Sequence, residues 1–446
     1  MKSLEKHSSV FLLFACLIVV TFFGVGNPYI FAVLGIVLCM AGLIEGAVKI
    51  DLWMFIPMVM GVVISAICSY RTYSNILEGY TVYFALYPVM YMMFSYLDEK
   101  EGAMLRKLCV LWCEVVAGIA FGKYIYYGIQ GISYRVGGIL GNPNSLGIFL
   151  VLAWFTVLRL REEENDGKRN CLEKIICFGE PLLLVVLMLT LSMGSFLALA
   201  VGFIVYTVQK KSIKKVIPLI AQMGLYLGTG LLLCVASREQ LNIMILILLY
   251  VYIVLLCINS KNIKEFLEKY FKVSAFITAT GVLGAGTLVM LRPSAPETFI
   301  ERLEMMRNGW GYFMRNPLFG VGPFQWRMLN YADGDKYFNT WHIHNIPIHM
   351  AVEFGIFAVL VLVIIFTRVL LKKENRRIRP AATAFIVHNL MDTSFFYFVN
   401  TSLLMLGNRA ITGKEKHVNH VISRILYIIF GIFFVYAFMY SLKIIG

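Results

Sequence analysis

The clearest chemical signal in the sequence is the string WHIHN at residues 341–345, directly before an apolar run. An imidazole with the ordinary pKa of ~6.5 is largely neutral at pH 7 and can accept a proton from a hydroxyl. Nearby arginines favour this neutral form because they oppose the imidazolium charge. The alternative, which would be favoured for a lone histidine, is that the residue only caps the end of a membrane span. Metal ligation by His342 and His344 is a weak interpretation, because no carboxylate or Cys accompanies them at ligand spacing.

A second candidate is Arg302, which lies in a segment with the period of an amphipathic helix. The apolar residues of this stripe are Phe299, Leu303, Met306, Trp310 and Phe313, and Pro296 suits the first helical turn. The stripe is expected to lie on the membrane surface or on other spans. Arg302 lies at its edge, where a guanidinium can grip a diphosphate through two parallel hydrogen bonds. An ion pair with Glu301 or Glu304 is the competing interpretation, although those acids point to other faces of the helix.

Two glycine-rich turns complete the chemical signals. The string RNPLFGVGPF begins at Arg315 and ends the amphipathic helix. The string RVGGILGNPNSLG spans 135–147, and its glycines allow the backbone to approach a ligand closely. Asn144 is expected to cap the helix that follows. The free backbone amides at the start of that helix, beside Arg135, form a ready anion site. A capped turn with a snorkelling arginine is the equally weighted alternative.

Three ionisable residues fall inside apolar runs: Glu353, His388 and Asp392. Such residues at membrane depth are functional candidates. The favoured interpretation is that they only tie helices together.

The elements that must hold these residues are membrane helices. The chain has 446 residues, 59% hydrophobic and 15% charged. Soluble domains are about 45–50% apolar and about 25% charged. The sequence therefore predicts one all-α polytopic domain over residues 1–446, with about 12 to 15 transmembrane helices. The net charge of +14 is typical of basic cytoplasmic loops and implies no nucleic acid.

The distribution of Lys and Arg along the chain predicts a cytoplasmic N-terminus, with a large extracytoplasmic loop at 291–345. The apolar run at 175–208 is too long for one span, so we expect two short helices that meet near Ser192. The run at 381–408 is either a hairpin of two half-helices or one tilted span. The nine cysteines show neither a disulfide framework nor zinc spacing.

Taken in order, these motifs resemble the O-antigen ligase and O-antigen polymerase superfamily of bacterial membrane glycosyltransferases. The resemblance runs from about residue 135 to 410. It implies a metal-independent, inverting enzyme of the multi-pass cytoplasmic membrane, without a cofactor. The donor would be an undecaprenyl-diphosphate-linked oligosaccharide and the acceptor a glycan, with polymerase favoured over ligase. Membrane lipids, a flippase and chain-length regulators are the other expected partners.

The same resemblance implies roles for particular residues. Arg302 would hold the donor diphosphate, and His344 would be the base that activates the acceptor. The substrate-binding residues proposed with them are Arg135, Asn142, Asn144, Arg315, Trp310 and Asn345. No residue is assigned to a metal.

One departure from the family pattern concerns charge. The family usually shows Ser-Arg-Gly between two short spans, whereas this chain has Ser192, Met193 and Gly194. Arg135 could supply the missing charge from the neighbouring outer turn. A divergent or inactive member, acting as a non-catalytic component of polysaccharide assembly, and a transporter or flippase are the alternatives.

Overall fold

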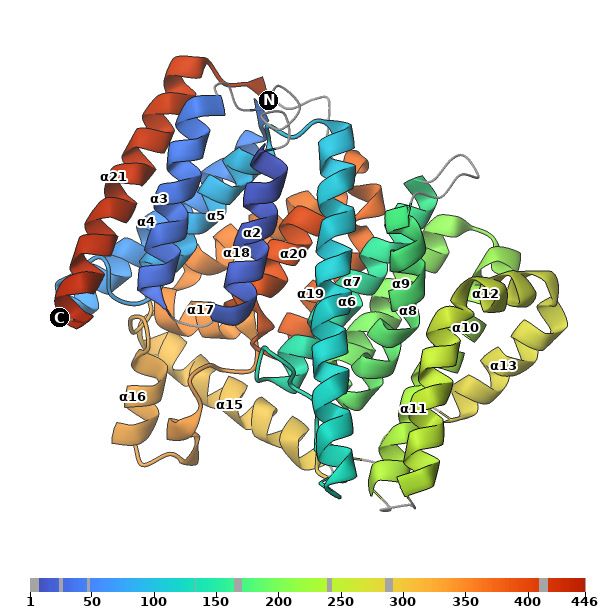
Figure 1. Cartoon of the computed structure of the whole chain (residues 1–446). Helices are drawn as coiled ribbons and strands as arrows, with labels where there is room; N and C mark the ends of the chain where they lie inside the picture. Colours follow the sequence, from blue (N-terminus) through green and yellow to red (C-terminus); the bar gives the residue numbers. More distant parts are fainter. Residues whose placement is uncertain are drawn as a thin grey trace.

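Helices stand side by side as a bundle in the computed structural model of the protein (Figure 1). The structure describes residues 8–23, 27–45, 49–132, 134–163, 171–238, 243–284, 292–408 and 416–445. Within these ranges the one sheet is an antiparallel pairing of two-residue strands, β1 (Lys49–Ile50) and β2 (Lys416–His417). The predicted all-α class is therefore confirmed.

The helices of the first third are α2 (Ser8–Phe23), α3 (Pro28–Glu45), α4 (Leu52–Tyr73), α5 (Thr81–Phe94), α6 (Glu99–Ile129) and α7 (Pro143–Glu163). The middle third forms α8 (Cys171–Leu189), α9 (Met193–Lys210), α10 (Ile213–Arg238), α11 (Ile243–Ile258), α12 (Ser260–Lys269) and α13 (Phe271–Gly284). The last third forms α15 (Ala295–Arg315), α16 (Gln325–Ala332), α17 (Ile346–Phe354), α18 (Ile356–Leu371), α19 (Arg379–Asn389), α20 (Phe398–Asn408) and α21 (His420–Ile445). Short 3-10 helices are η1 (Lys336–Asn339), η2 (Lys373–Arg377) and η3 (Ser394–Phe396).

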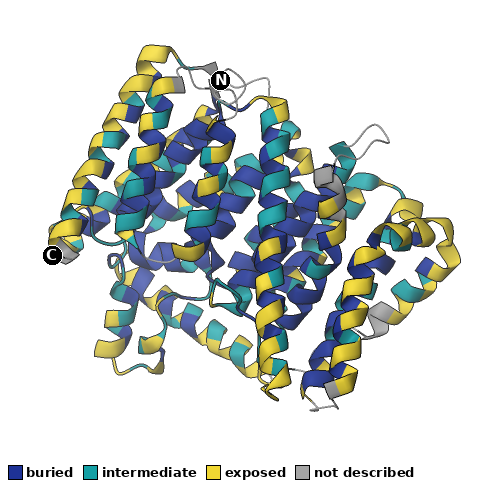
Figure 2. Ribbon diagram, in the orientation of Figure 1, coloured by how far each residue is buried: buried dark blue, intermediate teal, exposed yellow. Residues whose placement is uncertain are grey.

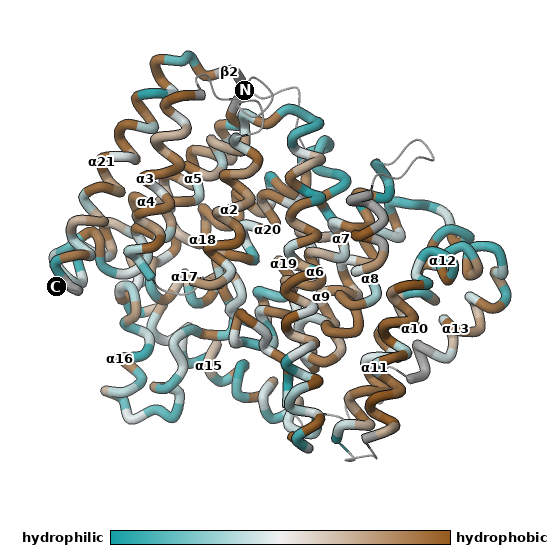
Figure 3. The backbone as a smooth tube through the Cα atoms, viewed as in Figure 1, coloured by the Kyte–Doolittle hydropathy of each residue, from teal (hydrophilic) through white to brown (hydrophobic). Residues whose placement is uncertain are grey.

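Six helices of the described chain are long and apolar enough to cross a membrane: α4, α6, α7, α9, α10 and α21. The pair α11 and α12, bent by 71°, would make a seventh span. Shorter apolar helices accompany them, and the outward faces of the bundle are largely apolar, as lipid contact requires (Figures 2 and 3). A polytopic membrane protein is thus supported, and the number of 12 to 15 spans stays a prediction.

The centre of the bundle is α7, which is buried from Ser145 to Leu160. A helix that is apolar on every side is stable only when other helices surround it. Helices α6, α8, α9, α19 and α20 pack around α7. The first turn of α7 therefore fixes the position of the side chains in the glycine-rich turn that precedes it.

The segment 292–345 covers the end of the bundle opposite the first residues of α2 (Figure 1). The predicted helix is present as α15, with its proline in the first turn. Its buried face comprises Met305, Gly309, Tyr312 and Phe313. A Cβ on Gly309 would lie 2.5 Å from Cδ1 of Ile343, so this glycine allows α15 to approach the histidine segment. Most side chains of the predicted apolar stripe are exposed in the structure. Of the two expected positions for the stripe, the membrane surface therefore fits better than packing on other spans.

The turn at 316–322 docks on the break between α17 and α18. The Ile356 amide donates to the Pro317 carbonyl at 2.9 Å, and the Val321 amide donates to the Val352 carbonyl at 2.8 Å. Gly355 has φ +77°, which favours glycine, and a Cβ there would meet the Leu318 carbonyl. The motif RNPLFGVGPF therefore joins the segment 292–345 to α17, the helix that follows the histidines.

Both ambiguous apolar runs are broken helices. The run at 175–208 forms α8 and α9, as predicted, and Ser192 caps α9 through the Ser195 amide. The run at 381–408 forms α19 and α20 joined through η3, which selects the hairpin alternative. Both connecting turns contribute to the site described next.

Candidate active site

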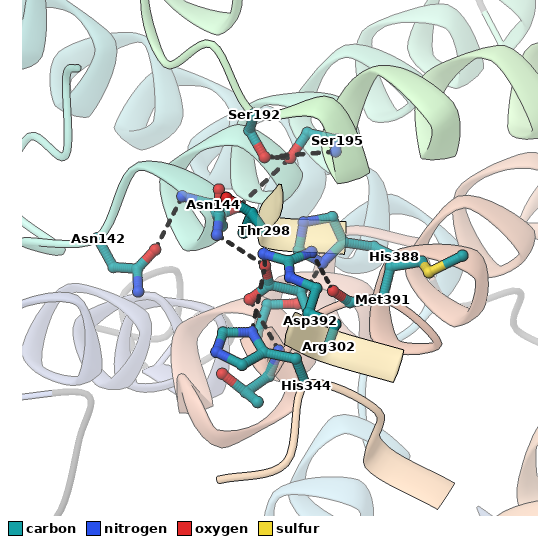
Figure 4. Close-up of polar contacts among 12 residues, drawn as sticks. Asn142, Asn144, Ser192, Ser195, Thr298, Arg302, His344, His388, Met391 and Asp392 are labelled. Atoms are coloured by element: carbon teal, nitrogen blue, oxygen red, sulfur yellow. Dashed lines mark hydrogen bonds and ion pairs between the residues drawn. The ribbon is translucent and has the colours of Figure 1, made fainter. Parts of the chain in front are cut away.

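The side chain of Asp392, in the turn between α19 and η3, is the meeting point of the candidate site (Figure 4). Its Oδ2 accepts hydrogen bonds from Arg302 Nη2 at 3.1 Å and from Asn144 Nδ2 at 2.7 Å. Its Oδ1 accepts from the Thr393 amide at 2.8 Å. The carboxylate is 3% exposed, so it joins α15, α7 and α19 in a setting from which water is largely excluded.

Arg302 is fixed on both sides of its guanidinium. Besides the ion pair with Asp392, its Nη1 donates to the Met391 carbonyl. The competing sequence interpretation paired Arg302 with an acid on its own helix. The structure shows instead that Glu304 pairs with Lys336 and Tyr337. The Arg302 Nε is buried without a hydrogen-bond partner, so the group retains a donor for a ligand.

Arg135 connects the glycine-rich turn to the turn between α8 and α9. Its Nε donates to the Thr190 carbonyl at 3.0 Å, and its Nη2 donates to Asn144 Oδ1 at 2.9 Å. Asn144 therefore bridges Arg135 and Asp392. The predicted helix cap is corrected here: Asn142 Oδ1, and not Asn144, accepts from the Asn144 and Ser145 amides, because Asn144 is turned toward the two charged groups.

A third arginine, Arg292, joins the cluster and was not singled out from the sequence. Its Nη1 donates to the Leu191 carbonyl at 3.3 Å. Leu191 has φ +46°, a conformation rarely adopted by residues with a bulky side chain. Arg135 and Arg292 thus contact consecutive carbonyls of the turn that precedes Met193. A basic residue at the start of the outer loop was the one signal that could have identified Arg292.

The charges of the cluster act on one another. Burial lowers the pKa of Arg135 to about 10, assisted by Arg292, so this side chain stays protonated at neutral pH. Burial and Arg302 also lower the pKa of Arg292. Burial opposes the ionisation of Asp392, but His344, His388 and Arg302 together lower its pKa. The cluster therefore holds three cations and one carboxylate, a net charge of +2.

His344 faces the same carboxylate from the loop before α17. Its Nδ1 lies 3.9 Å from Asp392 Oδ2, too far for a hydrogen bond but close enough for the carboxylate to orient the ring electrostatically. The side chain is 25% exposed, so a ligand can reach it. Asn345 caps α17 through the Ile348 amide at 3.0 Å and donates to the Leu390 carbonyl at 3.0 Å. This residue positions the histidine segment on the turn that carries Asp392.

The other histidines of this region pack behind the site. His342 Nε2 lies 2.9 Å from the Tyr80 hydroxyl, and its ring stacks on Phe396 with centroids 4.2 Å apart. Burial lowers the pKa of His342 well below its ordinary value, and His349 and His344 add to the effect. His349 is fully buried, and its Nε2 lies 3.4 Å from Glu353 Oε2. This contact lies within α17, so it does not join two helices as the favoured sequence interpretation expects.

Two predicted substrate-binding residues lie apart from the cluster. Arg315 is exposed at the end of α15, with its guanidinium 5.6 Å from the centroid of Tyr312. Trp310 is 52% exposed and packs on Phe313. At ~1.5 Å per residue, Arg315 lies about 20 Å along the helix from Arg302. The structure brings together Arg135, Asn144, Arg302, His344, Asn345 and the cap Asn142, but neither Arg315 nor Trp310 joins them.

The described part of the chain contains no group of three His, Cys, Asp or Glu side chains arranged for a metal ion. The polar groups that converge here are guanidiniums, amides, the Asp392 carboxylate and the His344 imidazole. Guanidinium groups match phosphate oxygens in charge and in bidentate geometry. The chemistry of the site is therefore that of an anion receptor with a base at its side.

Comparison with known families gives one match. Residues 181–363 match the family model described as O-antigen ligase. No curated protein matches the chain significantly. The matched segment contains Arg292, Arg302, His344 and the turn at Met193, whereas Arg135, Asn144 and Asp392 lie outside it. The superfamily recognised from the sequence motifs is confirmed by this match.

Proposed function

With the O-antigen ligase and polymerase superfamily as the premise, we propose that the protein is an inverting glycosyltransferase of the bacterial cytoplasmic membrane. It transfers an undecaprenyl-diphosphate-linked glycan to an acceptor glycan at the outer face and lengthens a cell-surface polysaccharide. One observation carries the proposal: Arg302 and His344 face Asp392, while Arg135 and Arg292 contact the turn before Met193. Asn144 joins the two groups by bonding to both Arg135 and Asp392.

The arginine cluster suits a diphosphate. Cleavage of the bond between a sugar and a diphosphate leaves negative charge on the leaving group, close to lipid of low dielectric constant. Arg135, Arg292 and Arg302 together with Asp392 carry a net charge of +2, which complements a diphosphate with two negative charges. Groups already fixed where charge develops lower the barrier without reorganising during the reaction.

His344 is the proposed base. The acceptor hydroxyl oxygen attacks the anomeric carbon of the donor sugar, and the bond from that carbon to the diphosphate oxygen breaks. The hydroxyl proton passes to the imidazole, and the lipid diphosphate leaves with the bonding electron pair. Because Nδ1 faces Asp392, we assign proton acceptance to Nε2. The carboxylate then stabilises the imidazolium that forms, as in other carboxylate and histidine pairs.

An apolar groove beside the site suits the lipid part of the donor. The groove is lined by residues of α4, α5, α17, α18, α19 and α20, and its volume is about 190 Å³. It runs from Lys372 at one end of α18 to Phe395, three residues from Asp392. A polyprenyl chain in this groove would place its diphosphate beside the arginines.

The alternatives differ in what they require of the site. A ligase would use the same residues with a different acceptor. A flippase would place charged residues along a path at mid-depth, whereas the cluster lies at one end of the bundle. A non-catalytic scaffold is motivated by Met193, yet Arg292 and Arg135 place two guanidiniums on that same turn. This observation favours an active enzyme.

Purified protein incubated with lipid-linked repeat units tests the proposal. Longer glycan is expected, and it should persist with EDTA because the cluster supplies its own cations.

His344→Gln restores a hydrogen-bonding group but accepts no proton, so chain growth should fall ~100-fold or more while donor binding persists. Arg302→Lys lacks the bidentate fork and should bind donor weakly. His420→Gln and Arg307→Lys, exposed elsewhere, serve as matched controls. Normal chain growth by His344→Gln would remove the proton-transfer role.

A further inference from the structure

A second charged cavity lies at the other end of α7 from the candidate active site. Its volume is about 200 Å³, and residues of α7, α9, η2 and the first turn of α19 form its walls. The charged residues on these walls are Arg159, Glu162, Lys210, Arg376 and Arg377. A helix of 21 residues is about 30 Å long. That length equals the thickness of the hydrocarbon core, so the cavity and the active site lie at opposite membrane faces.

The carboxylates at this cavity are already engaged. Glu162 Oε1 lies 2.6 Å from Lys210 Nζ. Glu163, directly beside the cavity, lies 2.8 Å from both Arg106 Nη2 and Arg159 Nε. Arg377 Nη1 approaches the same carboxylate at 3.7 Å. One carboxylate therefore serves three guanidinium groups.

The charge balance at the cavity is strongly positive. Two carboxylates face five cations, Arg106, Arg159, Lys210, Arg376 and Arg377, so the net charge is +3.

Burial makes the excess charge costly. The Arg106 and Arg159 side chains are only 4% and 5% exposed, and both lie against Glu163. Buried charges are stable when each has a counter-charge. A general excess of positive charge on a cytoplasmic surface would leave the cations in water, whereas here two of them are enclosed. An anion in the cavity would offset their repulsion.

We propose that this cavity binds a phosphate-bearing group in the leaflet opposite the active site. The cavity is many times larger than the space for one water, and guanidinium groups bind phosphate oxygens in pairs. Basic pockets between helices at the cytoplasmic side of a membrane commonly hold anionic headgroups. The bound phosphate would join α7, α9 and η2, and it would stabilise the packing of α9 on α19, the helix that leads to Asp392. This site is separate from the proposed transfer reaction.

The test uses the full-length protein in vesicles of phosphatidylcholine, with or without phosphatidylglycerol, and in a third arm with inorganic phosphate. Retained lipid is counted by native mass spectrometry, and the unfolding temperature is measured in each arm. The double variant Arg376→Gln and Arg377→Gln removes two exposed wall cations and spares the buried ones. The matched control, Lys373→Gln with Arg424→Gln, removes two exposed charges that do not line the cavity.

Phosphatidylglycerol should be retained and should raise the unfolding temperature of the unaltered protein and the control. The cavity variant should bind this lipid about 30-fold more weakly. Its unfolding temperature in phosphatidylcholine alone shows whether it has folded. If inorganic phosphate alone reproduces the gain with the same dependence on the variant, the site stands with a soluble ligand. Equal losses in variant and control, or no response to either phosphate source, would overturn the proposal.

Discussion

At the residue scale, Asp392 organises the site because it fixes the positions of the side chains around it. It fixes Arg302 and Asn144 through hydrogen bonds and orients His344 at 3.9 Å. A lone carboxylate at a diphosphate site would repel the ligand. Three arginines outweigh it, so the carboxylate serves to keep cations with long flexible side chains in one geometry, which reduces the entropy lost when the ligand binds.

The first prediction at this scale concerns the arginine that is absent at position 193. Arg292→Ala should weaken donor binding at least tenfold, because a charge-assisted hydrogen bond contributes about 1.5–3 kcal/mol. Met193→Arg in that background should restore part of the affinity, since Arg292 contacts the turn that directly precedes position 193. Binding is measured by titration with the lipid diphosphate, and Arg307→Ala is the control. Unchanged affinity in Arg292→Ala would exclude this arginine from the diphosphate site.

A second residue-scale prediction concerns pH. Burial lowers the pKa of His342 well below its ordinary value, so the folded protein resists protonation there while the unfolded chain binds a proton below pH ~6.5. The free energy of unfolding is therefore highest above that pH, where His342 is neutral in both states, and it decreases as the pH falls below it. The unfolding temperature should drop between pH 7.5 and pH 5.

His342→Gln is the comparison for this prediction, because its amide can still bond to Tyr80 but does not titrate. The variant should lose less of its unfolding temperature than the unaltered protein over the same pH range. Equal slopes in the two proteins would show that His342 does not control this acid sensitivity.

At the element scale, the outer segment depends on the break between α17 and α18. Gly355→Ala should destabilise the protein by about 2 kcal/mol or more, because an alanine there is strained and meets the Leu318 carbonyl. Gly311→Ala is the matched control on α15, where an added Cβ meets nothing within 4 Å. It should stabilise the helix by about 0.5–1 kcal/mol. Thermal unfolding in detergent compares the two, and a neutral Gly355→Ala would contradict the docking of the turn at 316–322.

At the scale of the whole molecule, orientation in the membrane decides which face meets the lipid-linked donor. The cytoplasmic N-terminus stays a prediction from charge. In the structure α21 runs from the end where α2 begins toward the end that holds α15 and α16 (Figure 1). Tyr440, near the end of α21, donates to Glu78 Oε1 at 2.7 Å. The same orientation therefore predicts that the chain leaves α21 on the outer side.

Cysteine labelling tests this orientation in a background without the nine native cysteines. An impermeant reagent added outside cells should modify a Cys at Ala332, which is exposed at the end of α16, and should spare one at Lys373 in η2. Both should react after the membrane is permeabilised, which controls for accessibility. The reverse pattern would place the active site in the cytoplasm and overturn the proposed function.

The sequence alone determined the features that depend on local pattern. Runs of apolar residues specify membrane helices because the bilayer leaves the backbone no other partner. The proline and the apolar period located α15, and the serine in the run at 175–208 located the break between α8 and α9. The order of the motifs was sufficient to recognise the superfamily that the family match supports.

Only the tertiary structure decided which charges meet. Arg302 pairs with Asp392, ninety positions away, and Arg292 reaches the turn before Met193 from a different part of the chain. Asn142, and not Asn144, caps α7, because the Asn144 side chain accepts from Arg135 at Oδ1 and donates to Asp392 from Nδ2. Local spacing could not reveal these contacts, because a buried charge takes whichever partner the packing of the helices brings within hydrogen-bonding distance, and that packing is a property of the whole bundle.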